Sequence, residues 1–166
     1  MKKFIYLFLI LSFSCEKDDV CSENTQTTPR IVLEFYNLEA PDDTLDVPEL
    51  LAVGLDNENM MVPITNELIM TRSMIALPLK TDDTQATFIL FKNYNVEEGV
   101  VTGNPDTITI TYQTNDVYVS RACGYKTNFD VQTFSIIEDA DQWMSSSDII
   151  LRQITNENEI HVKILH

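Results

Sequence analysis

Apolar and polar residues alternate through most of the chain after residue 30, with the two-residue period of β-strands. The clearest case is residues 107–112, where threonines alternate with Ile and Tyr and β-branched side chains occupy both faces. The same period at residues 31–36, 87–91 and 160–164 predicts three more strands. Further strand candidates are residues 50–55, 73–79, 116–122, 131–138 and 148–155.

Clusters of Asn, Asp, Pro and Gly separate most of these runs and favour tight reversals. They lie at residues 41–43, 82–83, 103–106, 115–116 and 156–158. The last cluster lies between two strand candidates and predicts a C-terminal hairpin. Only residues 138–144 favour a short helical turn. Eight or nine short strands at this spacing predict an all-β fold, a single antiparallel β-sandwich of the Ig-like or Greek-key kind, with a small β-barrel as the alternative.

The N-terminus has a different pattern. Two lysines follow Met1, residues 4–11 are apolar, and Ser12-Phe13-Ser14 leads to Cys15. This order is typical of a secretory signal peptide, and a Cys at the cleavage point makes it resemble a bacterial lipoprotein signal, in which Cys15 is acylated. A retained anchor is the alternative, but the apolar run is much shorter than the roughly 20 residues of a helical span. We therefore expect a signal peptide at 1–14, a lipidated tether at 15–28 and a sandwich domain at 29–166.

The residues after Cys15 suggest a side of the membrane. Glu16 is followed by Lys17, Asp18 and Asp19, which resembles the short signal that sends some Bacteroidota lipoproteins to the outer face of the outer membrane. A polar tether would contain such residues in any case, because charges keep a linker solvated. The prediction is therefore surface exposure, with the periplasm-facing leaflet as the alternative.

The balance of charge excludes one class of partner. The formal net charge is −15, and removal of residues 1–14 takes away Lys2 and Lys3 but no acid, which leaves 9 basic and 26 acidic residues and a net charge of −17. Such a field repels nucleic acid. Because 44% of the residues are hydrophobic, the chain can still bury a sizeable core.

Three cysteines are present, at positions 15, 21 and 123. If a lipid occupies Cys15, then Cys21 and Cys123 are the pair left in an oxidising compartment, and we predict a disulfide between them. Two free thiols are the alternative. With the bridge in place, the six-residue step from Cys15 to Cys21 spans at most about 20 Å, so the domain would lie close to the membrane.

Motifs for catalysis are mostly missing. There is no Gly-x-Ser-x-Gly, His-Glu-x-x-His, Cys-x-x-Cys or phosphate-binding glycine loop. The two histidines, His161 and His166, would face opposite sides of a strand, and we expect His161 to face solvent. We therefore predict a protein that is not an enzyme and needs no cofactor, with a carboxylate-based hydrolase as the remote alternative. Acidic loops offer weak candidates for calcium ligands at Asp42, Asp43, Asp82 and Asp83.

Two kinds of surface feature remain. Asp43-Thr44-Leu45 and Asp106-Thr107-Ile108 match the Asp-Ser/Thr-apolar pattern of Bacteroidota O-glycosylation, each where a turn is expected to enter a strand, so Thr44 and Thr107 are candidate acceptors. Residues 118–126 place two tyrosines and two basic residues around Cys123. This aromatic and basic segment predicts a docking patch, made of Tyr118, Arg121, Tyr125 and Lys126.

Four segments together resemble an uncharacterised family of Bacteroidota lipoproteins: residues 15–21, with their two cysteines, Thr28-Pro29-Arg30, Asn104-Pro105-Asp106-Thr107, and Arg121-Ala122-Cys123-Gly124-Tyr125. The resemblance implies a cell-envelope lipoprotein and assigns no catalytic residue. The leading hypothesis is a lipid-anchored, non-enzymatic module that docks another envelope protein, such as an outer-membrane protein. A surface module that binds glycan or calcium is the alternative.

Overall fold

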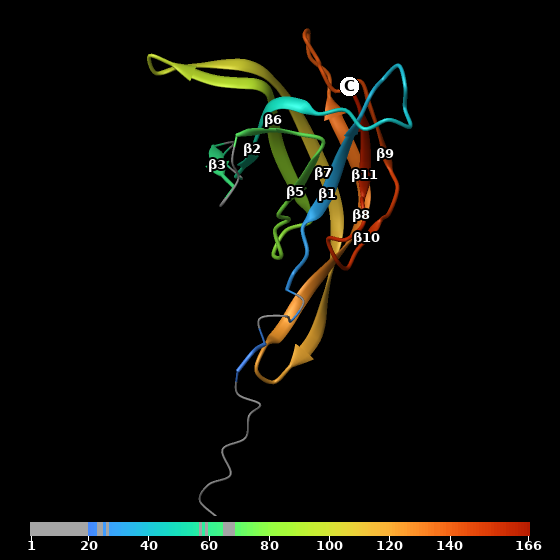
Figure 1. Cartoon of the computed structure of the whole chain (residues 1–166). Coiled ribbons are helices and arrows are strands. Elements are labelled where there is room, and N and C mark those ends of the chain that lie inside the picture. Colours follow the sequence, from blue (N-terminus) through green and yellow to red (C-terminus); the bar gives the residue numbers. More distant parts are fainter. Residues whose placement is uncertain (1–19, 23–24, 26, 57, 59, 65–68) are drawn as a thin grey trace, which may run out of the picture.

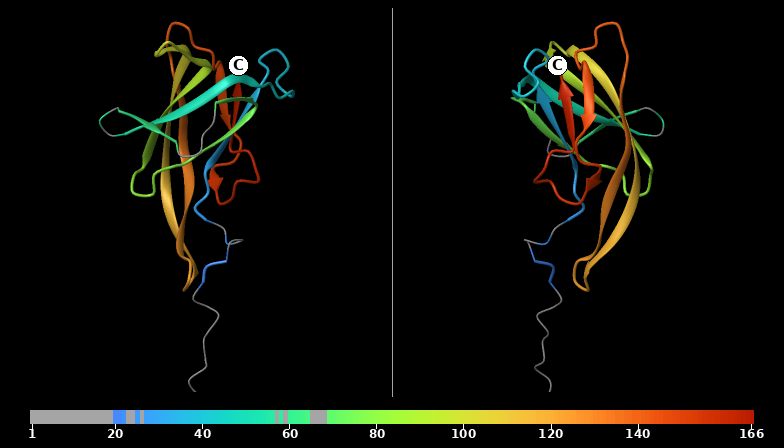
Figure 2. Two further views of the ribbon diagram at one scale, coloured as in Figure 1. Left: turned by 60° about the vertical axis from the view of Figure 1, so that its left-hand side comes forward. Right: turned by 90° about the vertical axis from the view of Figure 1, so that its right-hand side faces the viewer.

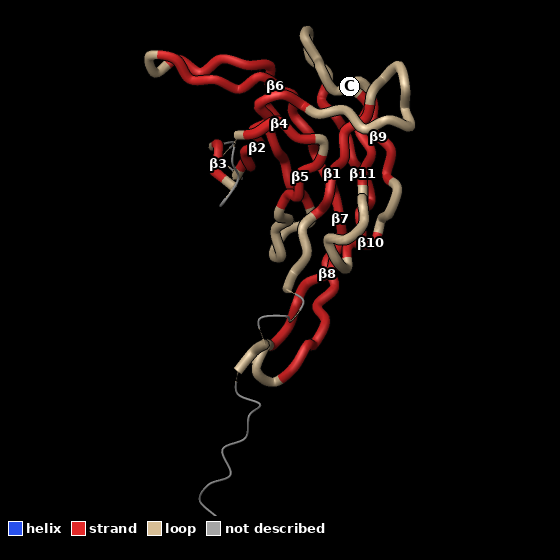
Figure 3. The backbone as a smooth tube through the Cα atoms, viewed as in Figure 1, coloured by secondary structure: helices blue, strands red, loops and turns tan. Residues whose placement is uncertain are grey.

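The computed structural model describes residues 20–22, 25, 27–56, 58, 60–64 and 69–166. This part of the chain forms two β-sheets and no helix, and so no helix that could cross a membrane (Figures 1 and 3). The all-β prediction is confirmed. Eleven strands lie within the described ranges, rather than eight or nine, because several short strands at the sheet edges lack a clear alternation.

The smaller sheet has four strands in the order β5 (Met74–Leu77), β1 (Ile31–Tyr36), β11 (Val162–Leu165) and β9 (Ser146–Ile149). Within it, β1 and β11 run parallel, and the other neighbours run antiparallel. The first and last strands of the domain therefore pair directly, which closes the fold on itself.

The larger sheet has seven strands. Its order is β10 (Gln153–Ile154), β8 (Gly124–Ile137), β7 (Val100–Ser120), β6 (Gln85–Glu97), β2 (Val47–Leu55) and β3 (Met61–Pro63), while β4 (Met70–Arg72) also pairs with β2. The sheet is strongly curved, as the turned views in Figure 2 show. Such curvature follows from the twist that accumulates along long strands.

One hydrophobic core lies between the sheets. The smaller sheet contributes every second residue of β1, and the larger sheet contributes inward-facing residues of its long central strands. Among the fully buried side chains are Ile31, Leu33, Phe35, Leu90, Ile108, Ile110, Tyr112 and Met144. The alternation in the sequence therefore corresponds to a real division between an inner and an outer face.

The 21-residue strand β7 is the longest element, and it contains two clusters that the sequence predicted as turns. At Gly103, φ is +123°, and at its neighbour across the ladder, Asn93, φ is 56°. A Cβ atom at Gly103 would lie 2.9 Å from the Asn93 carbonyl oxygen. The register of β6 and β7 shifts at this point. Asn93 and Tyr94 of β6 therefore form a β-bulge opposite Gly103, and residues 104–106 continue the ladder instead of reversing the chain.

The second predicted turn in β7, Asn115-Asp116, is also wrong. Both residues pair with β8, opposite Asn128 and Thr127. The Thr127 hydroxyl donates a 2.7 Å hydrogen bond to the Asp116 carboxylate. This cross-strand bond satisfies the polar side chain within the ladder, so the pair does not need a turn.

Residues 138–144 form a loop instead of the expected helical turn, and one buried carboxylate fixes it. Asp106 is fully buried, and its Oδ2 accepts hydrogen bonds from the backbone N–H groups of Trp143 (3.0 Å) and Met144 (2.7 Å). Trp143 packs on Phe35 with ring centroids 5.8 Å apart. Burial raises the pKa of the Asp106 carboxyl above its ordinary value, and the carboxylates of Asp139 and Asp141 add to this shift.

The predicted C-terminal hairpin does not form around residues 156–158. Strand β10 pairs with β8 in the larger sheet, whereas β11 pairs with β1 and β9 in the smaller one. The loop therefore carries the chain from one sheet to the other. Arg30 holds it in place, with its guanidinium 2.7 Å from the Glu157 carboxylate.

His161 was expected to face solvent, and this prediction is wrong. Its side chain is fully buried, and its Nδ1 accepts a 3.0 Å hydrogen bond from the backbone N–H of Val32. The backbone N–H of His161 donates to the Val32 carbonyl oxygen in return. Because Nδ1 is an acceptor, the ring must be neutral there. Burial lowers the pKa of His161 below its ordinary value, against the opposing effect of Glu159 and Glu157.

We predict that Asp106→Ala lowers the free energy of unfolding by about 2–4 kcal/mol, because it leaves two buried N–H groups without an acceptor. Asp106→Asn retains an oxygen that can accept both bonds and removes the buried charge, so its stability should lie within about 1 kcal/mol of the wild type. Urea denaturation of both variants tests this. Equal losses in the two variants would show that the hydrogen bonds do not fix the loop.

We also predict that the protein loses stability in mild acid. In the unfolded chain His161 takes up a proton near its ordinary pKa of about 6.5, whereas in the folded protein the buried ring resists protonation. The free energy of unfolding should therefore be steady above about pH 6.5 and fall as the pH drops below this value. Denaturation between pH 7.5 and 5 measures the slope. His161→Asn, which can still accept from Val32, should lose part of the slope, while His166, whose pKa burial also lowers, retains its own share. An unchanged slope would refute the assignment.

Candidate functional site

The residues predicted for lipidation and export, Cys15, Lys17, Asp18 and Asp19, lie outside the described residues, as does the predicted signal peptide. The description starts at Val20, next to Cys21. Of the residues that the sequence analysis singled out, Cys21 is therefore the first that the structure describes.

The predicted disulfide between Cys21 and Cys123 is confirmed, with the two Cα atoms 4.9 Å apart. It joins the N-terminal segment to the turn at the tip of the β7–β8 hairpin, far below the body of the sandwich in Figure 1. A second contact supports the same arrangement, because the backbone N–H of Thr127 donates a 3.0 Å hydrogen bond to the Thr28 hydroxyl. The N-terminal segment is thus fixed along the outer part of this hairpin.

The tip also brings together the two tyrosines of the predicted docking patch. Tyr118 and Tyr125 are direct cross-strand partners, and their rings form an edge-to-face pair with centroids 5.5 Å apart. They are 58% and 70% exposed. Large aromatic side chains held rigidly in solvent are well suited to anchor a binding partner. We call these two residues the tyrosine pair.

The two basic residues of the patch lie differently. Arg121 is exposed in the turn that follows β7. Lys126 pairs with Val117, one position along from the tyrosine pair and therefore on the other face of the hairpin. Its Nζ donates a 3.2 Å hydrogen bond to the Thr155 carbonyl oxygen. Lys126 therefore joins the hairpin to the loop after β10, and Arg121 is the cation that remains beside the tyrosine pair.

The two candidate glycosylation sites differ in accessibility. Thr44 is exposed and forms an isolated bridge with Tyr36. Thr107 was expected where a turn enters a strand, but it lies inside β7, half-buried between Ile89 and Ile137 of the neighbouring strands. Asp106 before it is part of the core. Of the two, Thr44 has the accessible position.

The calcium candidates lie in two separate loops. Asp83 accepts hydrogen bonds from the backbone N–H groups of Thr84 (2.7 Å) and Gln85 (3.3 Å), and its Oδ2 lies 3.6 Å from the Lys80 ammonium. The Thr84 bond is the main reason that the pKa of Asp83 is lowered. Asp82 lies beside it, and Asp42 and Asp43 lie in the exposed loop before β2. Among the described residues, no group of three His, Cys, Asp or Glu side chains is placed to hold a metal ion.

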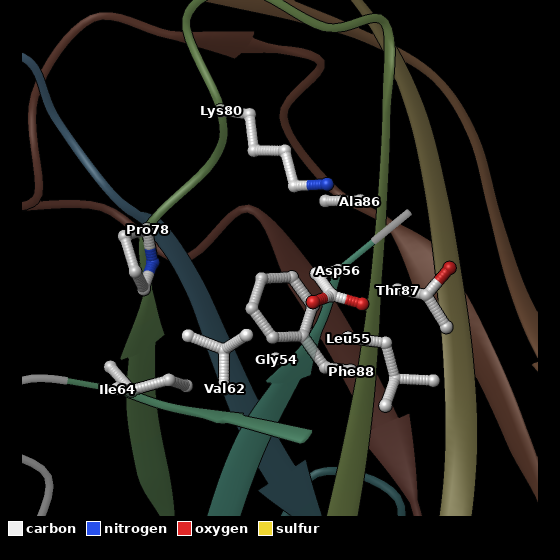
Figure 4. A pocket seen from close by; sticks show the side chains of 10 residues that line it. All are labelled: Gly54, Leu55, Asp56, Val62, Ile64, Pro78, Lys80, Ala86, Thr87 and Phe88. Atoms are coloured by element: carbon white, nitrogen blue, oxygen red, sulfur yellow. The ribbon is translucent and has the colours of Figure 1, made fainter. Parts of the chain in front are cut away.

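A pocket that the sequence did not reveal opens between the sheets, with a volume of about 230 Å³ (Figure 4). Gly54 of β2 lies at its centre, opposite Phe88 of β6 and Val62 of β3. Ile64, Pro78 and Ala86 add further apolar walls, and Pro78 comes from the segment that follows β5 of the smaller sheet.

Charged residues surround the mouth of this pocket. Asp56 and Lys80 belong to its lining, and an adjoining hollow of about 410 Å³ is lined by Asp56, Glu58, Lys80, Asp82 and Asp83. The Asp56 Oδ1 accepts hydrogen bonds from the backbone N–H groups of Glu58 (2.9 Å) and Met60 (2.8 Å). The site thus combines an apolar interior with a largely acidic entrance, a composition that suits ligand binding.

One signal in the sequence could have indicated the pocket. Gly54 interrupts the apolar run of residues 50–55 in β2, and a glycine inside a strand often marks a place where a side chain would obstruct a ligand or a neighbouring backbone. Its φ angle is not among the positive ones of the chain. A conformational need for glycine is therefore not the reason for the residue.

We predict that replacing both Cys21 and Cys123 by Ala lowers the free energy of unfolding by about 2–5 kcal/mol, since the bond closes a loop of 102 residues. Urea denaturation of the double variant and of reduced wild type measures the loss. Reduction should have no further effect on the variant. Alkylation of both thiols in unreduced wild-type protein, seen by mass spectrometry, would contradict the bridge.

The comparisons with known proteins identify a family but assign no function. No curated protein and no solved structure matches the chain significantly. One family does, described as a family of unknown function (DUF6452), and the match extends over residues 49–166. This range starts within β2 and continues through β11, and so includes the pocket and the tyrosine pair. The chain belongs to this family of unknown function.

Proposed function

We propose that the protein is a lipid-anchored, non-enzymatic module of the bacterial cell envelope that docks another envelope protein through the tip of the β7–β8 hairpin. The observation that carries the proposal is the Cys21–Cys123 bond. It ties the tip to a segment six residues from Cys15, the residue that a lipid would occupy. A tether of that length reaches at most about 20 Å.

Anchoring and docking are coupled in this arrangement. If Cys15 carries a lipid, the hairpin tip lies near the membrane surface, and the tyrosine pair and Arg121 lie where an integral membrane protein would be met from the side. Tyrosine and arginine are enriched among residues that dominate protein interfaces. The tether sequence Glu16-Lys17-Asp18-Asp19 supports the outer face of the outer membrane of a Bacteroidota cell as the location.

Affinity purification of the lipidated protein from gently solubilised membranes tests the proposal. We expect one partner in near-equal amount, which is lost when Cys15→Ala removes the anchor. A variant with Tyr118→Ser and Tyr125→Ser should keep the anchor, and the amount of partner recovered with it should fall at least about tenfold. Tyr94→Ser, at the other hairpin, is the matched control and should retain it.

The outcomes separate anchoring from docking. Full recovery of the partner with the double tyrosine variant would show that the tip is not the docking surface. Release of the Cys15→Ala protein into the soluble fraction would support the anchor independently. If no partner is recovered, the alternative proposal of glycan or calcium binding at the surface takes precedence.

A further inference from the structure

The apolar pocket around Gly54 is separate from the hairpin tip, and we infer a function for it that goes beyond docking. We propose that it binds a small amphiphilic cation, a molecule whose aromatic or branched hydrocarbon group fills the pocket and whose protonated amine lies among the carboxylates at the mouth. The proposal depends on the chemistry of the two halves of this site and on the rigidity of its rim.

The inner half requires a hydrocarbon. The Phe88 ring and Val62 come from the larger sheet, Ile64 directly follows β3, and Pro78 comes from the segment after β5. The volume of about 230 Å³ is several times the roughly 30 Å³ of one water molecule in the liquid. Water gains few hydrogen bonds between such walls, so an apolar group that replaces it is favoured. A sugar, with a hydroxyl on almost every carbon, does not match these walls.

Gly54 creates the space. Its position between Val62 and Phe88 in the cross-strand register is one where any larger side chain would project into the pocket. An added Cβ would meet the Val62 carbonyl oxygen at 3.6 Å and the Phe88 ring at 3.8 Å, which are ordinary contacts. A Cβ atom therefore fits here without straining the backbone, and a longer side chain would extend from it into the pocket.

The mouth determines the sign of the ligand's charge. The adjoining hollow has four carboxylates, from Asp56, Glu58, Asp82 and Asp83, and one ammonium, from Lys80. The Lys80 ammonium lies 3.6 Å from Asp83 and offsets part of that charge. The field at the mouth is therefore negative. It attracts an amine and repels a carboxylate of the same shape.

The part of the rim from Lys80 to Thr84 is held in place by hydrogen bonds within the protein. The Tyr112 hydroxyl donates a 3.0 Å hydrogen bond to the Lys80 carbonyl oxygen and accepts a 3.1 Å bond from the Lys80 backbone N–H. The Tyr112 backbone N–H donates to the Thr84 carbonyl oxygen. These bonds hold both ends of the segment that carries Asp82 and Asp83. A preformed site loses less conformational entropy on binding.

Three probes of one shape test the proposal on the full chain: 2-phenylethylamine, 2-phenylethanol and 3-phenylpropanoate. Methyl NMR of Val62, Ile64 and Ala86 reports occupancy of the pocket directly. We expect the amine to bind at least about tenfold tighter than the carboxylate, with the alcohol between them. The difference should shrink as salt is raised, because the charges at the mouth are exposed to solvent.

Two variants locate the site. Gly54→Leu should abolish the methyl shifts with all three probes while the denaturation midpoint stays near that of the wild type. Asp56→Asn with Asp83→Asn retains the oxygens that accept the backbone N–H groups and should remove most of the preference for the amine. Asp42→Asn with Asp43→Asn makes the same change of charge in another loop and is the matched control.

The results test separately whether the pocket binds a ligand and whether that ligand is a cation. Tight amine binding that Gly54→Leu removes supports the site, and its dependence on Asp56 and Asp83 supports the ligand class. Equal affinity for the three probes would overturn the cationic class. Absence of methyl shifts at about 10 mM amine, or shifts that persist in Gly54→Leu, would overturn the pocket itself.

Discussion

The continuous ladder along β7 is the constraint on which the rest of the structure depends. This strand pairs with β6 on one side and with β8 on the other, over 21 residues that extend up to roughly 70 Å. Its middle carries Asp106 and the core residues Ile108 and Ile110. Its end carries the tip, where the disulfide and the tyrosine pair lie. If this ladder were shorter, the hairpin would not project from the body of the protein, and the disulfide and the tyrosine pair would not lie at an extended tip.

Two distinct surfaces result from that geometry. The β7–β8 tip is polar and aromatic and is bound covalently to the N-terminal segment. The pocket lies within the body, lined by residues of β2, β3 and β6 and of the segment after β5, and the buried Tyr112 holds its rim by a hydrogen bond to Lys80. Because one surface is tied to the tether and the other is not, docking at the tip would leave the pocket open to small molecules.

The sequence predicted the structure correctly where a single local pattern or one possible pairing determines it. Alternation alone identified β1 with its correct bounds, because Ile31, Leu33 and Phe35 all belong to the core between the sheets. Counting cysteines predicted the disulfide, because the assignment of Cys15 to a lipid left one pair. The tyrosine pair was also accessible to sequence reasoning, because residues near a hairpin turn become cross-strand neighbours.

Sequence reasoning failed where tertiary contacts override local chemistry. Residues 103–106 have the composition of a turn, but they pair with β6, which bulges opposite Gly103, and the Asp106 side chain is buried in the core. His161 has the pattern of an exposed strand residue, yet the parallel pairing of β1 with β11 buries its ring against Val32. The pocket depends on segments from both sheets, and no local pattern brings Pro78 next to Gly54.

The central claim is that a short tether holds the hairpin tip at the membrane, and a distance measurement tests it most directly. The lipidated protein, with fluorine-labelled tyrosines, is placed in vesicles whose head groups carry spin labels. We predict strong broadening of the Tyr118 and Tyr125 signals and little for Tyr94, because the hairpin that carries Tyr94 lies at the opposite end of β7. Equal broadening at the three positions, or none at the tip, would contradict the account.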